Sequence, residues 1–302
     1  MTTTLENNKN FHVAAVIPTF NRKDKLNVIL TQLASQILLP NLMLEIIVCV
    51  DGSTDGTNEM IMEKFPSVHI VSGDGTWWYT KSMNMGFKYA QSLKIDFVLT
   101  LNDDIEINRN YLGTLFRDFL SLNESQAIIG TLSITNDERR LVHFSGIKKY
   151  LLKGLKSEYY HLPLTQPYSE SISGVLVSQE LPGRGMLIPN NVLLKLDFFD
   201  EIFPQYGSDT DFCLRAKRLG FKAYISWNAV VKVNMMLTRI RTDSGEDSIS
   251  NFLSDIFDEN SHYSIKKFYR FQHRHYGILN VIWSVPLYFI ANLIALIKKK
   301  YS

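Results

Sequence analysis

Cysteine is scarce in this sequence, with only Cys49 and Cys213 among 302 residues. Two cysteines in apolar or amphipathic runs cannot build a disulfide framework, which excludes a small secreted fold held by disulfides. A dominant charge is also lacking, because 32 basic residues stand against 30 acidic ones and leave a net charge of +2. No global field therefore attracts nucleic acid, and we expect no nucleic-acid partner.

Several signatures of other function classes are missing. The segment from Met1 to Phe11 is polar and has no apolar stretch, so we expect no signal peptide. The 7 histidines show no paired-ligand spacing, which argues against a zinc site. Gly73-Asp74-Gly75 is not followed by the third glycine of a dinucleotide fingerprint, and no Gly-Lys-Ser/Thr phosphate loop occurs.

The long uncharged run of the sequence lies near its C-terminus. Residues Gly277 to Ile297 carry no charge, and the tribasic Lys298 to Lys300 follows directly. The run is long enough for a membrane-spanning helix. A basic, aromatic segment also precedes it, and basic residues on both sides suit a helix lying among lipid headgroups better than a spanning one. We expect membrane association here, with a buried core helix as the alternative.

Short apolar runs alternate with helical patterns through the first half of the chain. Strands are predicted over residues 13–19, 45–51, 68–72 and 96–102, and helices over residues 25–37, 57–65, 81–93 and 111–122. Such strongly apolar strands predict an α/β fold, a mostly parallel sheet with helices on both faces. The second half is less regular, with a hairpin over 131–150, a polar excursion over 153–170, short helices over 190–196 and 209–219, and a polar loop or flap over 238–260.

The sharpest polar cluster, Asn102-Asp103-Asp104, follows a predicted buried strand. Ligands of open α/β sheets bind beyond the carboxyl ends of the strands, so these side chains are expected in a crevice. Two adjacent carboxylates repel each other unless a cation neutralises them, and a divalent metal with oxygen ligands can also hold a diphosphate. The alternative is an acidic cap for the next helix.

Two further clusters follow the second and third predicted strands. In the segment Asp51 to Thr57, Asp51 stands at a strand end, where it can bind a nucleobase or ribose, while Ser53 or Asp55 can cap the next helix. The segment Gly73 to Tyr79 combines a glycine turn with Trp77 and Trp78, whose rings suit sugar surfaces or, alternatively, core packing.

The last cluster, Tyr206 to Asp211, stands at the start of a predicted helix. The helix N-terminus favours the ionised forms of Asp209 and Asp211. One of these carboxylates can take a proton from an acceptor hydroxyl, whereas the alternative is simple helix capping.

Taken together, these clusters resemble family 2 of the glycosyltransferases, and within it the rhamnosyltransferase-like branch of bacterial surface-polysaccharide enzymes. The resemblance covers about Val13 to Val233 and is carried by six segments in order: VIPTFNR (16–22), VDGSTDGT (50–57), GDGTWW with MNMG (73–86), LNDDIE (101–106), GRGMLIP (183–189) and FDEIFPQYGSDTDFCLRAKRLG (199–220).

The resemblance implies the GT-A fold, a Rossmann-like mostly parallel sheet flanked by helices, and inverting transfer from a nucleotide sugar. It implies Asp209 as the catalytic base and Asp104 as the ligand of Mn²⁺ or Mg²⁺. The remaining candidates for nucleotide or substrate binding are Pro18, Thr19, Asn21, Arg22, Asp51, Gly75, Trp77, Trp78, Asn84, Asn102, Asp103, Arg184 and Asp211.

The expected organisation has a glycosyltransferase domain over 1–235, with a nucleotide-binding half (1–105) and an acceptor-binding half (106–235), and a membrane-associating segment over 236–302. The expected partners are a UDP- or dTDP-linked sugar, a saccharide or lipid-linked saccharide acceptor, and the cytoplasmic face of the cell membrane. Three positions depart from the family pattern: Asn102, Ser208 in place of Glu, and Asn234 in place of His. Asn234 leaves a catalytically silent nucleotide-sugar-binding relative, or a partner subunit of another glycosyltransferase, as the alternative.

Overall fold

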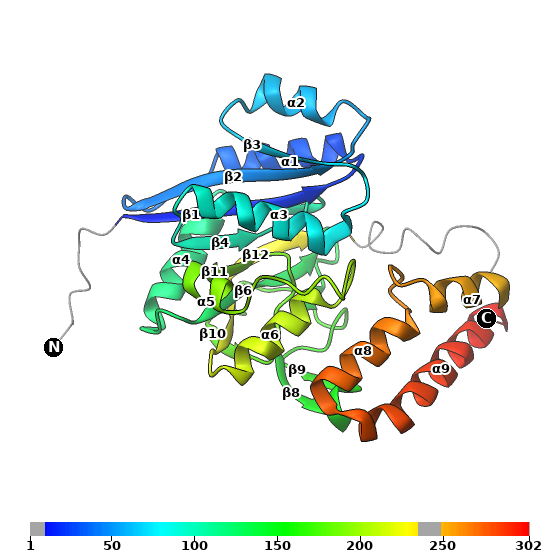
Figure 1. The fold of residues 1–302 in the computed structure, drawn as a ribbon. Helices are drawn as coiled ribbons and strands as arrows, with labels where there is room; N and C mark the ends of the chain where they lie inside the picture. Colours follow the sequence, from blue (N-terminus) through cyan, green and yellow to red (C-terminus); the bar gives the residue numbers. More distant parts are fainter. Residues whose placement is uncertain (1–9, 235–248, 302) are drawn as a thin grey trace.

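The computed structural model describes residues 10–234 and 249–301. In its first half, strands and helices alternate as the apolar pattern predicts (Figure 1). They are β1 (Phe11–Thr19), α1 (Lys23–Ala34), β2 (Leu42–Asp51), α2 (Thr57–Lys64), β3 (His69–Gly73), α3 (Trp78–Ser92), β4 (Phe97–Thr100), β5 (Ile105–Ile107) and α4 (Tyr111–Ser121).

The second half of the chain completes the sheet and adds the C-terminal helices. Its elements are β6 (Ile128–Thr135), β7 (Val142–Phe144), β8 (Ile147–Leu151), the 3₁₀ turn η1 (Leu152–Gly154), β9 (Lys156–Tyr159), β10 (Val175–Ser178), β11 (Met186–Pro189), α5 (Asn190–Lys195), α6 (Ser208–Arg218), β12 (Ala223–Val233), α7 (Ile249–Phe257), α8 (Ile265–Tyr276) and α9 (Ile278–Tyr301).

The main sheet has the strand order β10-β12-β6-β11-β4-β1-β2-β3, with β5 paired to β12 and β7 to β6. β4, β1, β2 and β3 run parallel, whereas β11 is antiparallel to both β4 and β6. The carboxyl ends of β1, β2 and β4 therefore lie at one edge, and the beginning of the reversed strand β11 lies at that same edge.

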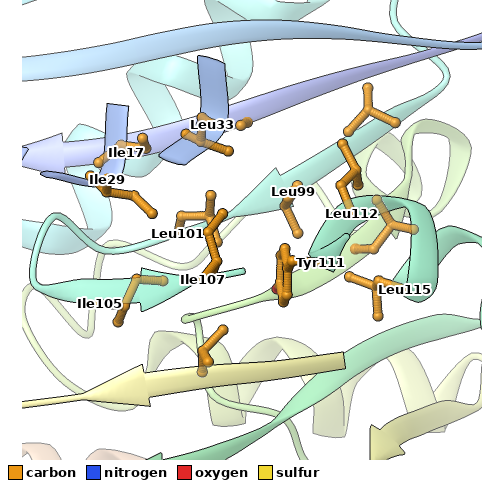
Figure 2. Packing of buried hydrophobic residues seen from close by; sticks show 14 of the residues in the cluster. Ile17, Ile29, Leu33, Leu99, Leu101, Ile105, Ile107, Tyr111, Leu112 and Leu115 are labelled. Carbon is orange, nitrogen blue, oxygen red and sulfur yellow. The ribbon is translucent and has the colours of Figure 1, made fainter. Parts of the chain in front are cut away.

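Helices cover both faces of the sheet, because its central strands are apolar on both sides. α1 and α4 pack on one face, and Figure 2 shows Ile29 and Leu33 of α1 and Tyr111, Leu112 and Leu115 of α4 against the strand residues of this core. α3, α5 and α6 pack on the other face through residues such as Phe87, Val192 and Phe212. The α/β prediction with a mostly parallel, helix-covered sheet is confirmed.

The structure also corrects parts of the second-half prediction. The polar excursion 153–170 contains β9, which pairs with β8 as a separate antiparallel hairpin. Within the predicted flap 238–260, residues 238–248 lie outside the described residues, and Ile249–Phe257 is the helix α7 rather than a loop. The basic, aromatic segment before the apolar run is itself a helix, α8, because Ser264 caps it by accepting from the Lys267 N–H.

The apolar run predicted near the C-terminus forms the helix α9. It lies beside α8, where the Phe268 and Tyr288 rings stack at a centroid distance of 4.1 Å and Asn280 Nδ2 donates to Gln272 Oε1 at 2.5 Å. Among the described residues, α9 is the helix long and apolar enough to cross a membrane, over Ile278–Ala295, and few side chains of that stretch are buried.

Candidate active site

The loops that follow β1 and β2 are tied together at the carboxyl edge of the sheet. Asn21, which adopts a positive φ of 50°, donates its N–H to Ser53 Oγ at 2.9 Å and accepts the Thr54 N–H on its Oδ1 at 2.7 Å. Asp55 accepts the Lys23 N–H at 2.9 Å and the Thr57 N–H at 3.2 Å, so it both joins the loops and stabilises the start of α2. The predicted Asn21 therefore has a structural part in shaping this edge.

The acidic cluster after β4 is held by residues of the β1 loop. Thr19 Oγ1 donates to Asp103 Oδ2 at 2.8 Å, and one Arg22 nitrogen, Nη1, reaches Asp103 Oδ1 at 3.0 Å and Asp104 Oδ2 at 3.2 Å. Burial raises the pKa of Asp103 to about 6, and the neighbouring Asp104 charge adds to the rise while Arg22 opposes it. The structure thus brings together Thr19, Arg22, Asp103 and Asp104, with Pro18 directly before them in β1.

The oxygen atoms near Asp104 fit a hard divalent cation that takes further ligands from a bound diphosphate. Asn102, two residues before Asp104, has a buried Oδ1 without a hydrogen-bond partner among the described residues, so it is an available neutral oxygen. Within residues 10–234 and 249–301, no three His, Cys, Asp or Glu side chains form a metal-binding group. Protein atoms would therefore fill only part of the coordination shell, and Arg22 holds the positive charge beside both carboxylates here.

The Asp51 carboxylate organises the loop that begins at Gly73. Its Oδ1 accepts the Gly75 N–H at 2.8 Å, and its Oδ2 accepts the N–H groups of Trp77 and Trp78 at 2.9 and 3.2 Å. A side chain on Gly52 would collide with the Gly75 nitrogen at 2.6 Å, so the two glycine turns can touch only without a Cβ. Asp51 therefore shapes the Gly75–Trp78 loop through its backbone, which is a part that the sequence did not predict.

The two tryptophans and Asn84 play different parts. The Trp78 side chain is 44% exposed at the edge of the sheet. The Trp77 ring instead contacts a cation, because Lys81 Nζ lies 5.8 Å from its centre. Asn84 is buried and is fully engaged with the chain near Phe199, accepting its N–H at 3.1 Å and donating to its carbonyl at 2.9 Å. These contacts revise the prediction for Asn84, because an inward-facing side chain that clamps α3 to this loop is not free to bind a nucleotide.

Asp209 stands in the first turn of α6, facing the loop that leads into β11. Its Oδ2 accepts the Gly183 N–H at 2.8 Å, and its Oδ1 accepts the Thr210 N–H at 2.8 Å. Two residues further on, the Gly185 N–H donates to the Thr100 carbonyl at 2.6 Å, at the end of β4. Since Asn102 to Asp104 follow β4, the Gly183–Gly185 loop brings Asp209 and the acidic cluster to the same edge.

Three side chains near Asp209 were missed from the sequence. The Tyr79 hydroxyl is buried and has no hydrogen-bond partner in the described part of the chain. A Cβ on Gly183 would lie 1.9 Å from this hydroxyl and 3.7 Å from Asp209 Oδ2. Burial raises the pKa of Glu180 to about 7, with the Asp209 charge adding to the rise. Burial lowers the pKa of Lys267 to about 8, against the opposing Asp209 charge. No spacing signal marks these residues, because they come from three separate parts of the chain: α3, the loop after β10, and α8.

Arg184 follows Gly183 in the same loop. Its charge acts on the Tyr79 hydroxyl and on the imidazole of His143, whose pKa falls to about 4 mainly because it is buried. Within the described residues, no carboxylate forms an ion pair with Arg184. A guanidinium without a counter-charge, one residue from the Asp209 contact, is suited to an anionic ligand group.

Asp211 is fully buried on α6 and faces away from the Gly183 loop toward α8. It accepts from Arg215 Nε at 2.7 Å, from Arg274 Nη1 at 3.0 Å and from His275 Nε2 at 2.9 Å. Burial alone would raise its pKa, but the hydrogen bonds from His275 and Arg215 and the Arg215 charge outweigh it and lower the pKa to about 2. Its oxygens are occupied, so the geometry revises the predicted substrate contact to a structural one.

One edge of the sheet thus carries the Asn102–Asp104 cluster, the Gly75–Trp78 loop and Asp209 of α6, an arrangement compatible with a glycosyltransferase. The chain belongs to the family described as glycosyl transferase family 2, whose model matches residues 14–175. The family expected from the sequence motifs is therefore confirmed.

Two curated relatives agree with this assignment. The chain is 27% identical over 224 residues to the low-salt glycan biosynthesis hexosyltransferase Agl10 of Haloferax volcanii, covering 72% of this chain and 68% of the relative. It is 23% identical over 172 residues to the rhamnosyltransferase WbbL of Escherichia coli K12, covering 55% of this chain and 64% of that protein. Both relatives are hexose or deoxyhexose transferases by name, and they support a role for this enzyme in glycan biosynthesis.

Two solved structures share the fold. GalNAc-T7, solved with UDP, GalNAc and Mn²⁺, superposes with a TM-score of 0.59 at 14% identity, covering 74% of this chain. TarS of S. aureus superposes with a TM-score of 0.55 at 17% identity, covering 89% of this chain. The chain spans 43% and 44% of the length of these two proteins. They confirm the GT-A-type fold.

Proposed function

We propose that this enzyme transfers a sugar, with inversion, from a UDP- or dTDP-linked donor to a hydroxyl of a saccharide or lipid-linked saccharide acceptor during cell-surface polysaccharide biosynthesis. The observation that carries the proposal is the Gly183–Gly185 loop, which bonds to Asp209 on one side and to the end of β4 on the other. A candidate base and a candidate diphosphate site thereby share one edge of the sheet.

Asp209 acts as the base in the proposed reaction. Its carboxylate takes the proton of the acceptor hydroxyl as that oxygen forms a bond to the anomeric carbon, while the bond from this carbon to the diphosphate breaks on the opposite face. The N–H groups of Gly183 and Thr210 hold the carboxylate in place and leave lone pairs on both oxygens. Arg184 neutralises charge on the departing diphosphate.

The donor side is assigned to the loops after β1, β2 and β3. Thr19 and Arg22 fix Asp103, and the Asp51-organised loop presents Gly75, Trp77 and Trp78 to the nucleotide and sugar. Asp104, with Asn102 Oδ1, would hold Mn²⁺ or Mg²⁺. Such a cation supplies positive charge beside the diphosphate. GalNAc-T7, which shares the fold, was solved with Mn²⁺ and UDP.

The proposed function assigns a role to each part of the chain. Residues 1–105 form the nucleotide-binding half and residues 106–235 the acceptor-binding half of one transferase domain. Residues 236–302 associate with the cytoplasmic face of the cell membrane, which would present a lipid-linked acceptor. The exposed apolar side of α9 supports this last assignment.

A thermal-shift panel of nucleotide sugars, with and without Mn²⁺, tests the proposed function. A ligand present at about 100 times its Kd should raise the melting temperature by about 5 °C, because binding to the folded state alone stabilises it. We expect this rise with a UDP- or dTDP-sugar plus Mn²⁺. In Asp104→Asn, which removes the carboxylate charge, most of the Mn²⁺-dependent rise in melting temperature should disappear.

Asp24→Asn is the matched control, because Asp24 is an exposed carboxylate in the first turn of α1. It should respond to the panel as the wild type does. A wild type that binds a nucleotide sugar but transfers nothing to any acceptor would identify a catalytically silent relative. A wild type that no nucleotide sugar stabilises would overturn the donor assignment.

A further inference from the structure

An open cavity of about 560 Å³ lies away from the active site, between the β8–β9 hairpin, α6 and α8. Its lining is rich in basic and aromatic side chains: Lys149, Tyr150, Lys217, Arg218, His275 and Tyr276. Figure 1 shows the green β8–β9 hairpin beside the turn that joins α8 to α9. The two segments touch, since a Cβ on Gly154 would lie 2.6 Å from the Tyr276 hydroxyl.

Two of the cations in this cavity have no counter-charge among the described residues. Lys217 Nζ donates to the neutral Gln179 Oε1, and Arg218 Nη2 donates to the Arg274 carbonyl at 3.1 Å and to His275 Nδ1 at 2.9 Å. Because Nδ1 of His275 accepts from Arg218, the proton of the imidazole lies on Nε2, and Nε2 donates to the buried Asp211. The acidic groups beside the cavity are already engaged: Glu158 pairs with Lys149 at 3.2 Å, and Glu180 accepts the Tyr150 hydroxyl. The cavity is therefore positive and suits a phosphate group.

Exposed apolar side chains follow two lining residues of this basic cavity, Tyr150 and Tyr276, in the chain, and we call them its apolar rim. On the turn into α9, Ile278 is 53%, Leu279 77% and Ile282 67% exposed, and Leu152 at the tip of the β8–β9 hairpin is 67% exposed. Large apolar side chains that gather around basic groups are typical of surfaces that dip into the headgroup region of a bilayer. Neither a soluble phosphate nor an acidic protein would need this apolar rim.

The packing of α9 favours a position in the plane of the membrane over one that crosses it. α9 packs along α8 through the Phe268–Tyr288 stack and the Asn280–Gln272 hydrogen bond. α8 carries Lys266, Lys267, Arg270 and Arg274 within 12 residues, so it cannot enter hydrocarbon with its partner. Arg274 also binds Asp211 of α6, which keeps the helix pair on the catalytic domain.

We propose that this cavity binds the headgroup phosphate of an anionic membrane phospholipid, while Leu152, Ile278 and Leu279 enter the headgroup layer around it. The inference rests on the proposed membrane association of the C-terminal segment, and adds to it a defined lipid site and a lipid preference. Lys217 and Arg218 supply the charge, and the Tyr276 hydroxyl stands at the wall of the site.

Flotation of the full-length chain with lipid vesicles tests the lipid site. Wild type should bind vesicles that contain phosphatidylglycerol and bind purely zwitterionic phosphatidylcholine vesicles much more weakly. A basic side chain near an anionic surface contributes about 1 kcal/mol, or about fivefold in affinity, so Lys217→Gln with Arg218→Gln should bind about 25-fold more weakly. Neither residue belongs to the proposed active site, so the thermal shift with nucleotide sugars should be unchanged.

Two controls keep the outcomes distinct. Lys64→Gln with Lys94→Gln removes the same charge from exposed positions on α2 and after α3, and should bind as wild type does. Leu279→Glu changes an exposed rim residue and should weaken binding to both kinds of vesicle. Equal binding of wild type and Lys217→Gln/Arg218→Gln overturns the lipid site but leaves membrane association standing. If the wild type binds no vesicle, both the lipid site and the membrane association are overturned. If inorganic phosphate binds the cavity as tightly as vesicles do, the ligand is a soluble anion and the lipid site is overturned.

Discussion

Replacing Asp209 with Asn should lower the rate of sugar transfer by about 10³-fold, within the range that general bases contribute. The amide has the same shape, and its oxygen can still accept the Gly183 N–H. It cannot take up the proton of the acceptor hydroxyl. Donor binding should therefore persist, and the loss should lie in kcat, measured by release of nucleoside diphosphate in the presence of acceptor.

Asp197→Asn is the matched control for this experiment. Asp197 is an exposed carboxylate after α5 with a positive φ of 52°, a conformation that Asn tolerates as well as Asp does. It should retain wild-type turnover. If Asp209→Asn transfers sugar at a rate within a few-fold of wild type, another group is the base, and Glu180, whose charge interacts with that of Asp209, becomes the next candidate.

Replacing Asp211 with Asn should cost about 3–5 kcal/mol of folding stability, the usual effect of breaking a buried ion pair from one side. The change leaves Arg215 and Arg274 without their shared buried counter-charge, and it weakens the contact between α6 and α8. For a chain of this size, a fall in melting temperature of about 5–8 °C follows, measured by calorimetry or circular dichroism.

Asp137→Asn provides the comparison, because the Asp137–Arg139 pair is exposed at the surface. Such a pair contributes less than about 1 kcal/mol, so its loss should be hard to detect. Asp211→Asn with a melting temperature equal to that of Asp137→Asn would show that the contact of Asp211 with Arg215, Arg274 and His275 does not stabilise the fold.

The stability contribution of Asp211 also has a pH signature. Its pKa is lowered in the folded protein, from 3.8 to about 2, so its stabilisation is present above the unfolded value and is lost as pH falls through the folded one. The stability difference between wild type and Asp211→Asn should be constant above about pH 5 and shrink toward pH 2.

Local patterns in the sequence were sufficient to predict the strands and helices from β1 to α4. Each apolar run from β1 to β4 ends at a turn with polar residues, and parallel strands bring such turns to one edge. The positions of Thr19, Asp103 and Asp104 follow from this rule alone. Arg22 was placed correctly at the edge. Its bonds to both carboxylates depend on the path of the loop after β1, and the periodicity of the sequence does not predict that path.

Long-range contacts are what the sequence could not reveal. Asn84 and Asp211 looked like ligand-binding residues because polar side chains in motifs usually face solvent or substrate. Their partners, Phe199 and the pair Arg274 and His275, lie far along the chain or on another helix. α8 was not predicted as a helix, although its residues are strongly segregated into polar and apolar sides, because its basic and aromatic composition was interpreted only as a flank of the apolar run.

The reversed direction of β11 has a consequence for how enzymes of this kind diverge. Because β11 runs against β4, the chain that enters it arrives at the carboxyl edge of β4, where the Gly183 N–H reaches Asp209. The register of the two strands, with Met186 opposite Thr100, holds this end of the segment in place whatever the sequence that leads into it. Under the proposed function, acceptor choice can therefore change through the segment before Gly183 while strands β1 to β4 keep the donor side. We expect a chimera that exchanges only residues 142–182 between relatives to change acceptor preference and to keep donor preference.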